Sequence, residues 1–490
     1  MKKAITLILL AVLAAQTLSA CGSTQSGGDT TASGDTTTSN GTSASGEYSY
    51  PYPAEGYGGE EFNILNMHDM YGMMSVIERE EITGETLDDA IYNRNRLIES
   101  KFDITLKETI IEDDWEFKTL AGVAQTTILA GDDTYDLMYI PMAGSAALIS
   151  EGYFFNLYDI DTVQLDQPWW YQSFNDAITI NGALYSAAGG SNLLIHDGIR
   201  LIAFNYDMME NLKLDLPYDL VREGKWTLDA FNQYNTAAAN LNGDDSVAWN
   251  KDGKATYGYT HHKTNSESFI IGAGELIFEQ QDGNLVYNGA SERFYNLIEK
   301  LSSIISLTDA RVYKGETADS EDGSYITVFR SGRTLMAMSE VNKFRGFRDL
   351  EFEFGIVPYP KYDESQDRYY SNSWYGATGA MIPVTSSDPE KVGLILDALT
   401  YEGEKSVVPV FREISVEQKG LRNEESIEML EIITDSLVPL YYQIFSIGKD
   451  LMTEVNAAIW EKTGTVASAV AANEDAIRSD LEKLTENWGK

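Results

Sequence analysis

The sequence predicts an α/β fold, and three patterns carry that prediction. Short apolar segments typical of strands alternate along the chain with longer segments whose apolar residues recur at helical spacing. Gly and Pro close several of these segments, as Gly131 and Pro141 do. The chain has 490 residues, of which 43% are hydrophobic, so it can form two or more domains with large cores. The succession favours largely parallel sheets with helices on both faces.

The N-terminus has the layout of a secretory signal peptide over residues 1–20. Lys2 and Lys3 precede an apolar run at 4–15, and small residues stand at Ser19 and Ala20. The run is too short to cross a bilayer comfortably as a permanent helix. We therefore expect an exported protein.

The only cysteine of the chain, Cys21, follows this segment directly. The tetrapeptide Leu18-Ser19-Ala20-Cys21 resembles the lipobox of bacterial lipoproteins, which implies that Cys21 is lipidated (palmitate and related acyl chains) and becomes the mature N-terminus. Two acyl chains suffice for stable membrane anchoring. Residues 21–58 are rich in Ser, Thr and Gly, so we expect a disordered tether there. The expected location is the extracellular face of the bacterial cell membrane.

The first α/β unit follows the tether. Its expected elements are a strand at 61–67, a helix at 87–102, a strand at 103–110, a helix at 114–131 and a strand at 135–141. In a parallel sheet the loops after these strands share one edge, where ligands bind.

A second unit starts near residue 198. Its expected elements are a strand and helix over 199–214, a helix at 224–241, a strand at 256–262 and a helix at 290–305. Further strands are expected within 325–341 and 352–362, and the rest of the chain is expected to be helical. Asp388 and Pro389 have the residue types of an N-cap and first helical position, which predicts a helix start there.

Composition excludes some partners. The formal charge of −40, from 36 Lys and Arg against 76 Asp and Glu, repels nucleic acid. With one cysteine and four histidines, the chain has no zinc-ligand spacing and no internal disulfide. We expect no cofactor and no metal.

Several segments in order resemble the extracellular solute-binding proteins of ABC importers, in particular the carbohydrate-binding group that includes maltose-binding protein. They include YDLMYIP at 135–141, INGALYSAAGG at 180–190, FRSGRTLMAMSE at 329–340 and the stretch from Gly376 to Lys405. The resemblance implies a two-lobed periplasmic-binding-protein-like fold with a ligand cleft between the lobes. Carried over, lobe 1 contains residues 59–197 plus 320–362, and lobe 2 contains 198–319 plus 363–490.

The resemblance also implies a function. The protein is expected to capture a sugar or oligosaccharide by lobe closure and to deliver it, as a monomer and without enzymatic activity, to an ABC transporter permease. Three alternatives stay open: binding of a peptide or other small polar solute, hydrolysis of glycans by a secreted enzyme, and sensing without a transporter. No nucleophile elbow or metalloprotease motif supports the hydrolase.

The loop at 240–252 is similar to calcium loops of some relatives. Asn240, Asn242 and Asp244 stand at alternating positions, but Asp245 replaces the turn glycine and Lys251 occupies the position of the bidentate glutamate. We interpret it as a degenerate loop.

Carbohydrate sites combine aromatic platforms with planar hydrogen-bonding groups. By this criterion, and by their positions at strand ends, the candidate ligand-binding residues are His68, Asp69, Tyr71, Ser145, Tyr185, His261, His262, Glu340, Trp374 and Tyr375. Each has an ordinary structural alternative: a helix cap for Asp69, a core edge for Trp374, a surface carboxylate for Glu340. Neighbouring strand residues face opposite ways, so at most one of the two adjacent histidines is expected in the cleft. Trp169 and Trp170 are expected to support the fold.

Overall fold

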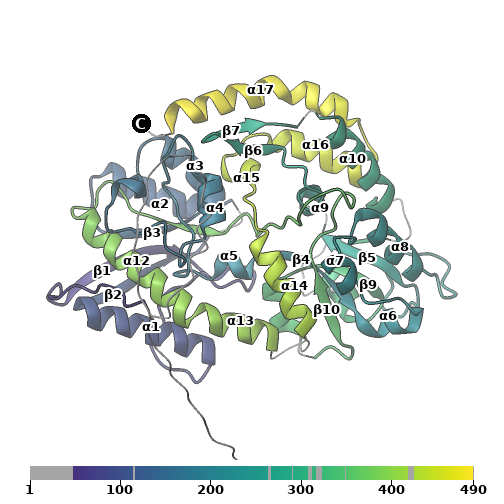
Figure 1. Ribbon diagram of the computed structural model, residues 1–490, viewed down its shortest axis with the longest axis horizontal. Coiled ribbons are helices and arrows are strands. Elements are labelled where there is room, and N and C mark those ends of the chain that lie inside the picture. The colour runs from purple at the N-terminus through teal and green to yellow at the C-terminus, as the bar shows by residue number, and fades with distance from the viewer. Residues whose placement is uncertain are drawn as a thin grey trace, which may run out of the picture. The chain divides into compact units, whose positions relative to one another are not determined.

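Strands of the chain form two main sheets (Figure 1). The computed structural model describes residues 48–113, 116–262, 266–289, 291–306, 312–315, 323–347, 349–417 and 424–488. The predicted signal peptide, Cys21 and most of the tether lie outside the described residues. From Tyr50 onward the chain forms one compact unit. In the described part of the chain, no helix is both long and apolar enough to span a membrane.

The first sheet has the strand order β11-β3-β1-β2. β1 pairs in parallel with both β2 and β3, while β11 pairs antiparallel with β3. The parallel arrangement brings the carboxyl ends of β1, β2 and β3 to one edge. The strands are β1 (Glu60–Met67), β2 (Ile104–Ile111), β3 (Leu137–Pro141) and β11 (Thr378–Met381).

The second sheet has the order β10-β4-β9-β5-β8 and mixes both directions. β5 is parallel to β8 and β9, whereas β4 is antiparallel to β9 and β10. A separate hairpin joins β6 and β7. These strands are β4 (Arg200–Asn205), β5 (Tyr257–His262), β6 (Phe278–Gln281), β7 (Asn284–Tyr287), β8 (Val312–Gly315), β9 (Thr334–Glu340) and β10 (Phe354–Val357).

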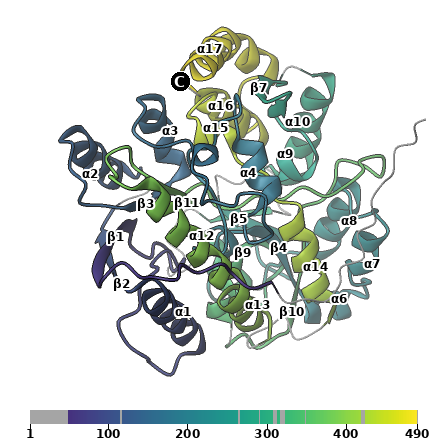
Figure 2. The ribbon, with the colours of Figure 1, turned by 60° about the vertical axis from the view of Figure 1, so that its left-hand side comes forward.

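Helices surround both sheets, as Figures 1 and 2 show. Those in the described residues up to 330 are α1 (Thr86–Phe102), α2 (Lys118–Leu129), α3 (Met142–Ser150), η1 (Leu157–Asp159), α4 (Gln172–Ile178), α5 (Leu194–Asp197), α6 (Tyr206–Leu212), α7 (Tyr218–Arg222), α8 (Leu228–Ala238), α9 (Ser266–Gly272), α10 (Glu292–Ile305) and α11 (Tyr325–Arg330). The later ones are η2 (Val341–Phe347), α12 (Pro389–Ser406), α13 (Val408–Glu417), α14 (Glu424–Asp435), α15 (Tyr441–Ile444), α16 (Lys449–Trp460) and α17 (Val466–Asn487).

The strand pairing differs from the predicted lobe boundaries in two places. Residues 320–362 were expected in lobe 1, but β9 and β10 both pair with β4 of the second sheet. Residues 363–490 were expected in lobe 2, but β11 pairs with β3 of the first sheet, and α12 packs against α1. The physical reason is that a buried strand has the same apolar pattern in either sheet, so sequence alone does not show which sheet it joins.

Tyr50 and Tyr52, at the start of the compact unit, form hydrogen bonds with side chains of α12. The Tyr50 hydroxyl donates to the Asp397 carboxylate (2.9 Å), and the indole nitrogens of Trp169 (3.0 Å) and Trp170 (2.8 Å) donate to the same side chain. Asp397 is fully buried, so these donors replace the water that its carboxylate loses. The expectation that the two tryptophans support the fold is confirmed.

Candidate functional site

The candidate site lies where the carboxyl ends of the first sheet's parallel strands meet. The loop after β1 carries Tyr71, the segment after β2 carries Phe117, and β3 leads directly into α3. Ligands of α/β folds bind outside the carboxyl ends of parallel strands. The topology therefore collects side chains from distant parts of the chain at one edge.

Four aromatic rings form a continuous group at this edge, which we call the aromatic strip. Trp374 packs edge-on against Tyr71 (6.0 Å between ring centroids) and Phe117 (5.7 Å), and Tyr375 lies 5.4 Å from Trp374. Phe117 and Tyr375 are 5.9 Å apart. Edge-to-face contacts at these distances are favourable for aromatic rings. Tyr71 is 58% exposed, while Trp374 is 5% exposed, so the strip runs from solvent into the interior.

Two residues of the strip have unusual backbones. Tyr71 and Phe117, each following a parallel strand, both have φ of 55°, in the left-handed region. This conformation is uncommon for bulky residues and costs energy unless the surroundings fix it. Such residues concentrate at functional sites, which supports a site at this edge.

A set of buried polar residues, which we call the polar edge, lies at the matching edge of the second sheet. Arg200 begins β4 and Glu340 ends β9, and the two are register partners. A guanidinium nitrogen of Arg200 donates to Glu267 of α9 (2.9 Å), and Arg200 Nε lies 3.5 Å from Glu340. Asn342, two residues beyond β9, completes the set. All four side chains are buried.

Burial and ion pairing shift the pKa values of the polar edge in opposite directions. Burial raises the pKa of the Glu267 carboxyl, and the positive charge of Arg200 counteracts that rise. Although burial alone disfavours the Arg200 cation, Glu267 and Glu340 together raise its pKa above the ordinary value. The charged forms therefore support one another inside the protein.

The aromatic strip and the polar edge are in contact. The Asn342 amide donates to the carbonyl oxygen of Tyr71 (3.0 Å). Burial raises the pKa of the Tyr375 hydroxyl to about 12, and the charges of Arg200 and Glu267 also act on it. Residues of the two sheets thus meet at this place.

Two buried polar atoms of the polar edge lack hydrogen-bond partners among the described residues: Arg200 Nε and Asn342 Oδ1. One is a donor and the other an acceptor. Buried polar groups in folded proteins are nearly always hydrogen-bonded, and exceptions call for an explanation such as a bound molecule. Arg200 Nε lies within ion-pair distance of Glu340 (3.5 Å), so Asn342 Oδ1 is the one of the two atoms without a charged partner.

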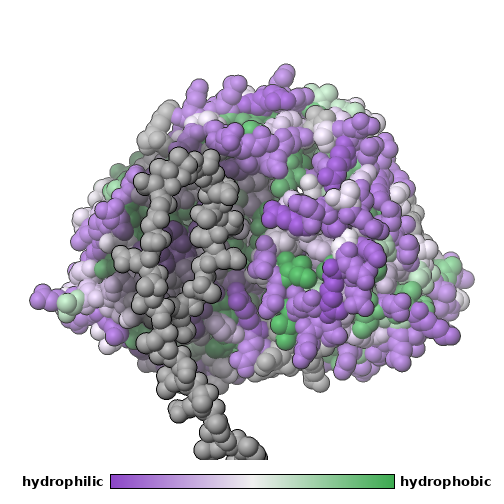
Figure 3. Space-filling view, in the orientation of Figure 1, coloured by the Kyte–Doolittle hydropathy of each residue, from purple (hydrophilic) through white to green (hydrophobic). Residues whose placement is uncertain are grey.

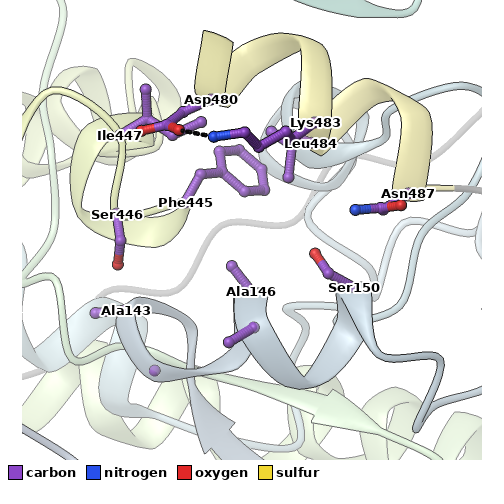
Figure 4. A pocket seen from close by; sticks show the side chains of 12 residues that line it. Ala143, Ala146, Ser150, Phe445, Ser446, Ile447, Asp480, Lys483, Leu484 and Asn487 are labelled. Atoms are coloured by element: carbon purple, nitrogen blue, oxygen red, sulfur yellow. Dashed lines mark hydrogen bonds and ion pairs between the residues drawn. The ribbon is translucent and has the colours of Figure 1, made fainter. Parts of the chain in front are cut away.

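A cavity of about 270 Å³ adjoins the strip through α3. Figure 4 shows the small residues of α3 on one side and Phe445, with α17, on the other. Phe117 links this cavity to the strip, because a Cβ atom at Gly144 would lie 3.4 Å from Phe117. The polar rim contains Ser150, Ser446, Asn487 and the Asp480–Lys483 ion pair (2.9 Å). An apolar floor, an aromatic ring and a polar rim suit a ligand with both C–H faces and hydroxyls.

Four of the predicted site residues come together here. Tyr71, Trp374 and Tyr375 belong to the strip, and Glu340 belongs to the polar edge. Glu340 is not a surface carboxylate, because it is 6% exposed and faces Arg200 and Lys343.

His68 and Asp69 stand beside Tyr71 in sequence but interact with the backbone. Asp69 Oδ1 accepts from the amides of Ser75 (2.7 Å) and Val76 (3.0 Å), so it shapes the loop. His68 Nδ1 accepts from the Asp113 amide (3.3 Å). Both side chains therefore serve the loops around Tyr71 and Phe117 in this structure.

Ser145 and Tyr185 lie apart from the strip. Ser145 is in α3, not in a loop as expected, and its hydroxyl donates to the Met142 carbonyl (3.0 Å). Tyr185 packs edge-on against Trp488 (5.5 Å). The two line a cavity of about 10 Å³, which has room for one water molecule at most.

The adjacent histidines face opposite ways, as alternation along β5 predicts. His261 is fully buried and stacks on Trp460 with ring centroids 4.0 Å apart. His262 is partly exposed and lies 6.3 Å from the Tyr325 ring. His261 therefore belongs to the core of the second sheet, and only His262 can face a ligand.

The loop at 240–252 uses its oxygens for backbone contacts. Asp244 Oδ2 accepts from the amides of Lys254 (2.6 Å) and Ala255 (2.8 Å), and Asn240 Oδ1 accepts from the Asn242 amide (2.8 Å). Within the described ranges, no group of three or more His, Cys, Asp or Glu side chains is placed to hold a metal ion.

Sequence reasoning missed Phe117, Arg200, Glu267 and Asn342. Phe117 follows β2 as Tyr71 follows β1, so the strand-end argument could have found it. Arg200 and Glu267 meet only through the pairing of β4 with β9 and the packing of α9, and the sequence carries no signal for these contacts.

No protein-family model and no curated protein matches the chain. Solved structures do match. An ABC substrate-binding protein of Listeria monocytogenes in complex with cycloalternan is 15% identical, with 86% of this chain and 99% of that chain covered and a TM-score of 0.56. A cyclo/maltodextrin-binding protein complexed with maltotetraose is 14% identical, with 88% and 99% covered and a TM-score of 0.58.

A third similar structure binds a different solute. UgpB of Mycobacterium tuberculosis, in complex with glycerophosphocholine, is 12% identical, with 87% of this chain and 99% of that chain covered and a TM-score of 0.57. At these identities the likeness establishes the fold. The chain has the two-sheet α/β fold of the solute-binding proteins of ABC transporters.

Proposed function

We propose that this protein is a lipid-anchored extracellular solute-binding protein that captures a sugar or oligosaccharide between its two halves and delivers it to an ABC transporter permease. The observation that carries the proposal is the aromatic strip in contact with a buried polar edge, where Asn342 Oδ1 has no hydrogen-bond partner among the described residues. Sugars offer C–H faces for aromatic rings and hydroxyls for such polar atoms. The similar structures bound to cycloalternan and maltotetraose support the same ligand class.

Isothermal titration of the tail-free protein tests the ligand class. The panel contains maltotetraose, cycloalternan and lacto-N-biose, with glycerophosphocholine as the non-sugar polar solute. Saturable heat from a sugar supports the proposal, and heat from glycerophosphocholine alone favours a different polar solute, as the likeness to UgpB permits. Chromatography of the titrated sugars tests the hydrolase alternative, since hydrolysis products would contradict simple binding.

The Tyr71→Ala variant tests the site. Tyr71 is 58% exposed, so its removal is expected to leave the fold intact while weakening sugar binding by about tenfold, the size of a lost aromatic contact at a binding hot spot. Tyr158, which is 47% exposed on η1, provides the matched control in Tyr158→Ala. Equal affinities of the two variants would exclude Tyr71 from the site.

Anchoring through Cys21 is tested separately. The Cys21→Ser variant is expected to appear in the culture medium, while the unaltered protein partitions into detergent with the membrane fraction. Release of both proteins would contradict the anchor without affecting the ligand proposal.

A further inference from the structure

We infer that Asn342 and Arg345 of η2, together with Asp197, form a clamp that positions the Tyr71 turn, and that ligand affinity depends on this clamp. The inference rests on the proposed function, because Tyr71 matters only if the aromatic strip binds the solute. The three clamp residues act as positioning residues for the Tyr71 ring. Their contacts are with backbone groups of residues 71–74.

The turn needs outside support. Tyr71 and Gly72 are successive residues with φ of 55° and 78°. Glycine adopts this region freely, but a tyrosine pays a steric cost there. A strained residue keeps such a conformation only when surrounding contacts fix it.

The clamp supplies those contacts at three backbone groups. The Asn342 amide donates to the Tyr71 carbonyl (3.0 Å), and the Arg345 guanidinium donates to the Gly72 carbonyl. Asp197 accepts from the Met74 amide (2.9 Å).

Asp197 and Arg345 also form an ion pair with each other. The two guanidinium nitrogens of Arg345 lie 2.7 Å from the two carboxylate oxygens of Asp197, in the bidentate arrangement. Asp197 is fully buried, which makes this charge-assisted pair strong and its geometry specific.

The rest of the same loop, residues 75–78, is held by one carboxylate of the loop itself and one of β2. The amides of Ser75 and Val76 donate to Asp69, and those of Ile77 and Glu78 donate to Glu108 of β2. Only residues 71–74 depend on Asp197 and η2. Loss of the clamp is therefore expected to release the Tyr71 turn without releasing the whole loop.

The clamp connects the two sheets. Tyr71 follows β1 of the first sheet, whereas η2 continues directly from β9 of the second sheet, and α5 with Asp197 precedes β4. The Tyr71 ring is 58% exposed, so its position is set by its backbone more than by burial. Asn342 Oδ1, buried and without a partner among the described residues, lies beside the same turn and offers an acceptor to a hydroxyl of the bound solute.

The first arm of the test needs no ligand. Hydrogen exchange of the tail-free protein is followed by mass spectrometry in peptides covering 70–76, for the unaltered protein, Arg345→Gln, Asn342→Leu and the control Arg222→Gln. Arg222 of α7 donates through two guanidinium nitrogens to Glu428 (2.9 and 2.7 Å) and makes no contact with η2 or the turn among its hydrogen bonds in the described residues. We expect exchange in 70–76 to accelerate by about tenfold or more in both clamp variants and to stay unchanged in the control. Unchanged exchange in both clamp variants overturns the inference.

The second arm is a double-mutant cycle with the tightest-binding sugar among maltotetraose, cycloalternan and lacto-N-biose. Arg345→Gln is expected to weaken binding by about tenfold, and adding Tyr71→Ala to it is expected to cause little further loss, because both changes remove the same ring from the site. Fully additive losses overturn the inference. Asn342→Leu, which keeps the buried ion pair, takes the place of Arg345→Gln if that variant does not fold.

The two arms separate the two proposals. If no panel solute binds the unaltered protein while exchange in 70–76 responds to the clamp variants, the sugar proposal fails and the positioning of the turn stands. If a sugar binds but exchange in 70–76 does not respond, the function stands and the clamp fails.

Discussion

At the scale of single residues, two fully buried carboxylates have several defined partners each. Asp397 holds two tryptophans and Tyr50 together, and Asp197 holds Arg345 and the Met74 amide. Carboxylates this deeply buried are stable only when donors replace their lost water. Their removal would leave several donors without partners at once, which makes them poor sites for substitution.

His196 allows a prediction on pH dependence. It is 4% exposed, its Nε2 lies 2.6 Å from the Tyr171 hydroxyl, and burial, with Arg412 nearby, lowers its pKa from 6.5 to about 3. In the unfolded chain His196 therefore binds a proton near pH 6.5, whereas in the folded protein it binds one only near pH 3. Stability from neutral His196 is present above pH 6.5 and is lost as the pH falls.

Urea unfolding at pH 7.5 and 5.0 checks this. Between the two pH values the unaltered protein is expected to lose about 2 kcal/mol more unfolding free energy than His196→Gln, since each pH unit below 6.5 contributes about 1.36 kcal/mol. Equal losses of unfolding free energy in the two proteins would mean that His196 is protonated in the folded protein at the ordinary pKa of a histidine.

At the scale of elements, the sequence predicted those with strong local signals. Asp388 caps α12 by accepting from the Lys391 amide (3.1 Å), as the Asp-Pro start predicts. The strands β1, β2, β3 and β5 lie at the expected segments. No helix was predicted at α3, whose Ala, Gly and Ser content gives little amphipathic pattern. Helix formation there depends on packing against α2 and α15, which no local pattern encodes.

The C-terminal end of α17 carries a prediction on stability. Trp488 is 5% exposed and packs edge-on against Tyr185 (5.5 Å) and Phe445 (5.2 Å). Trp488→Ala is expected to lower the unfolding free energy by about 3–5 kcal/mol, as loss of a large core side chain does. Glu482→Ala, on the exposed surface of the same helix, is expected to change it by less than about 0.5 kcal/mol. Similar urea midpoints for the two variants would show that the Trp488 contacts add nothing.

At the scale of the whole molecule, the site is a product of topology. Tyr71, Trp374, Tyr375 and Glu340 were found from sequence because they stand at strand ends or beside a small-residue strand. Arg200 and Glu267 were not, because only the antiparallel pairing of β4 with β9 brings Arg200 opposite Glu340. The assignment of β9, β10 and β11 to sheets failed for the same reason: their apolar patterns are interchangeable, and long-range pairing decides between them.

The net charge gives a prediction for the molecule as a whole. The face shown in Figure 3 is mostly hydrophilic, and the sequence carries a formal charge of −40. Repulsion among these carboxylates opposes the compact state, and salt screens it. Raising NaCl from about 20 mM to about 200 mM is expected to raise the Tm by a few degrees. The Tm is measured by calorimetry at pH 7.5. A Tm that stays constant or falls over this range would show that repulsion among the carboxylates does not destabilise the folded protein.

The late position of β11 in the sequence has a consequence for biosynthesis, because β11 is the antiparallel partner of β3. The other three strands of the first sheet leave the ribosome early, whereas β11 emerges only after the whole second sheet has been translated. Until then the nascent chain presents β3 as an open edge that another chain could pair with. Export before folding, or a chaperone that shields this edge during translation, would therefore protect the growing polypeptide from self-association.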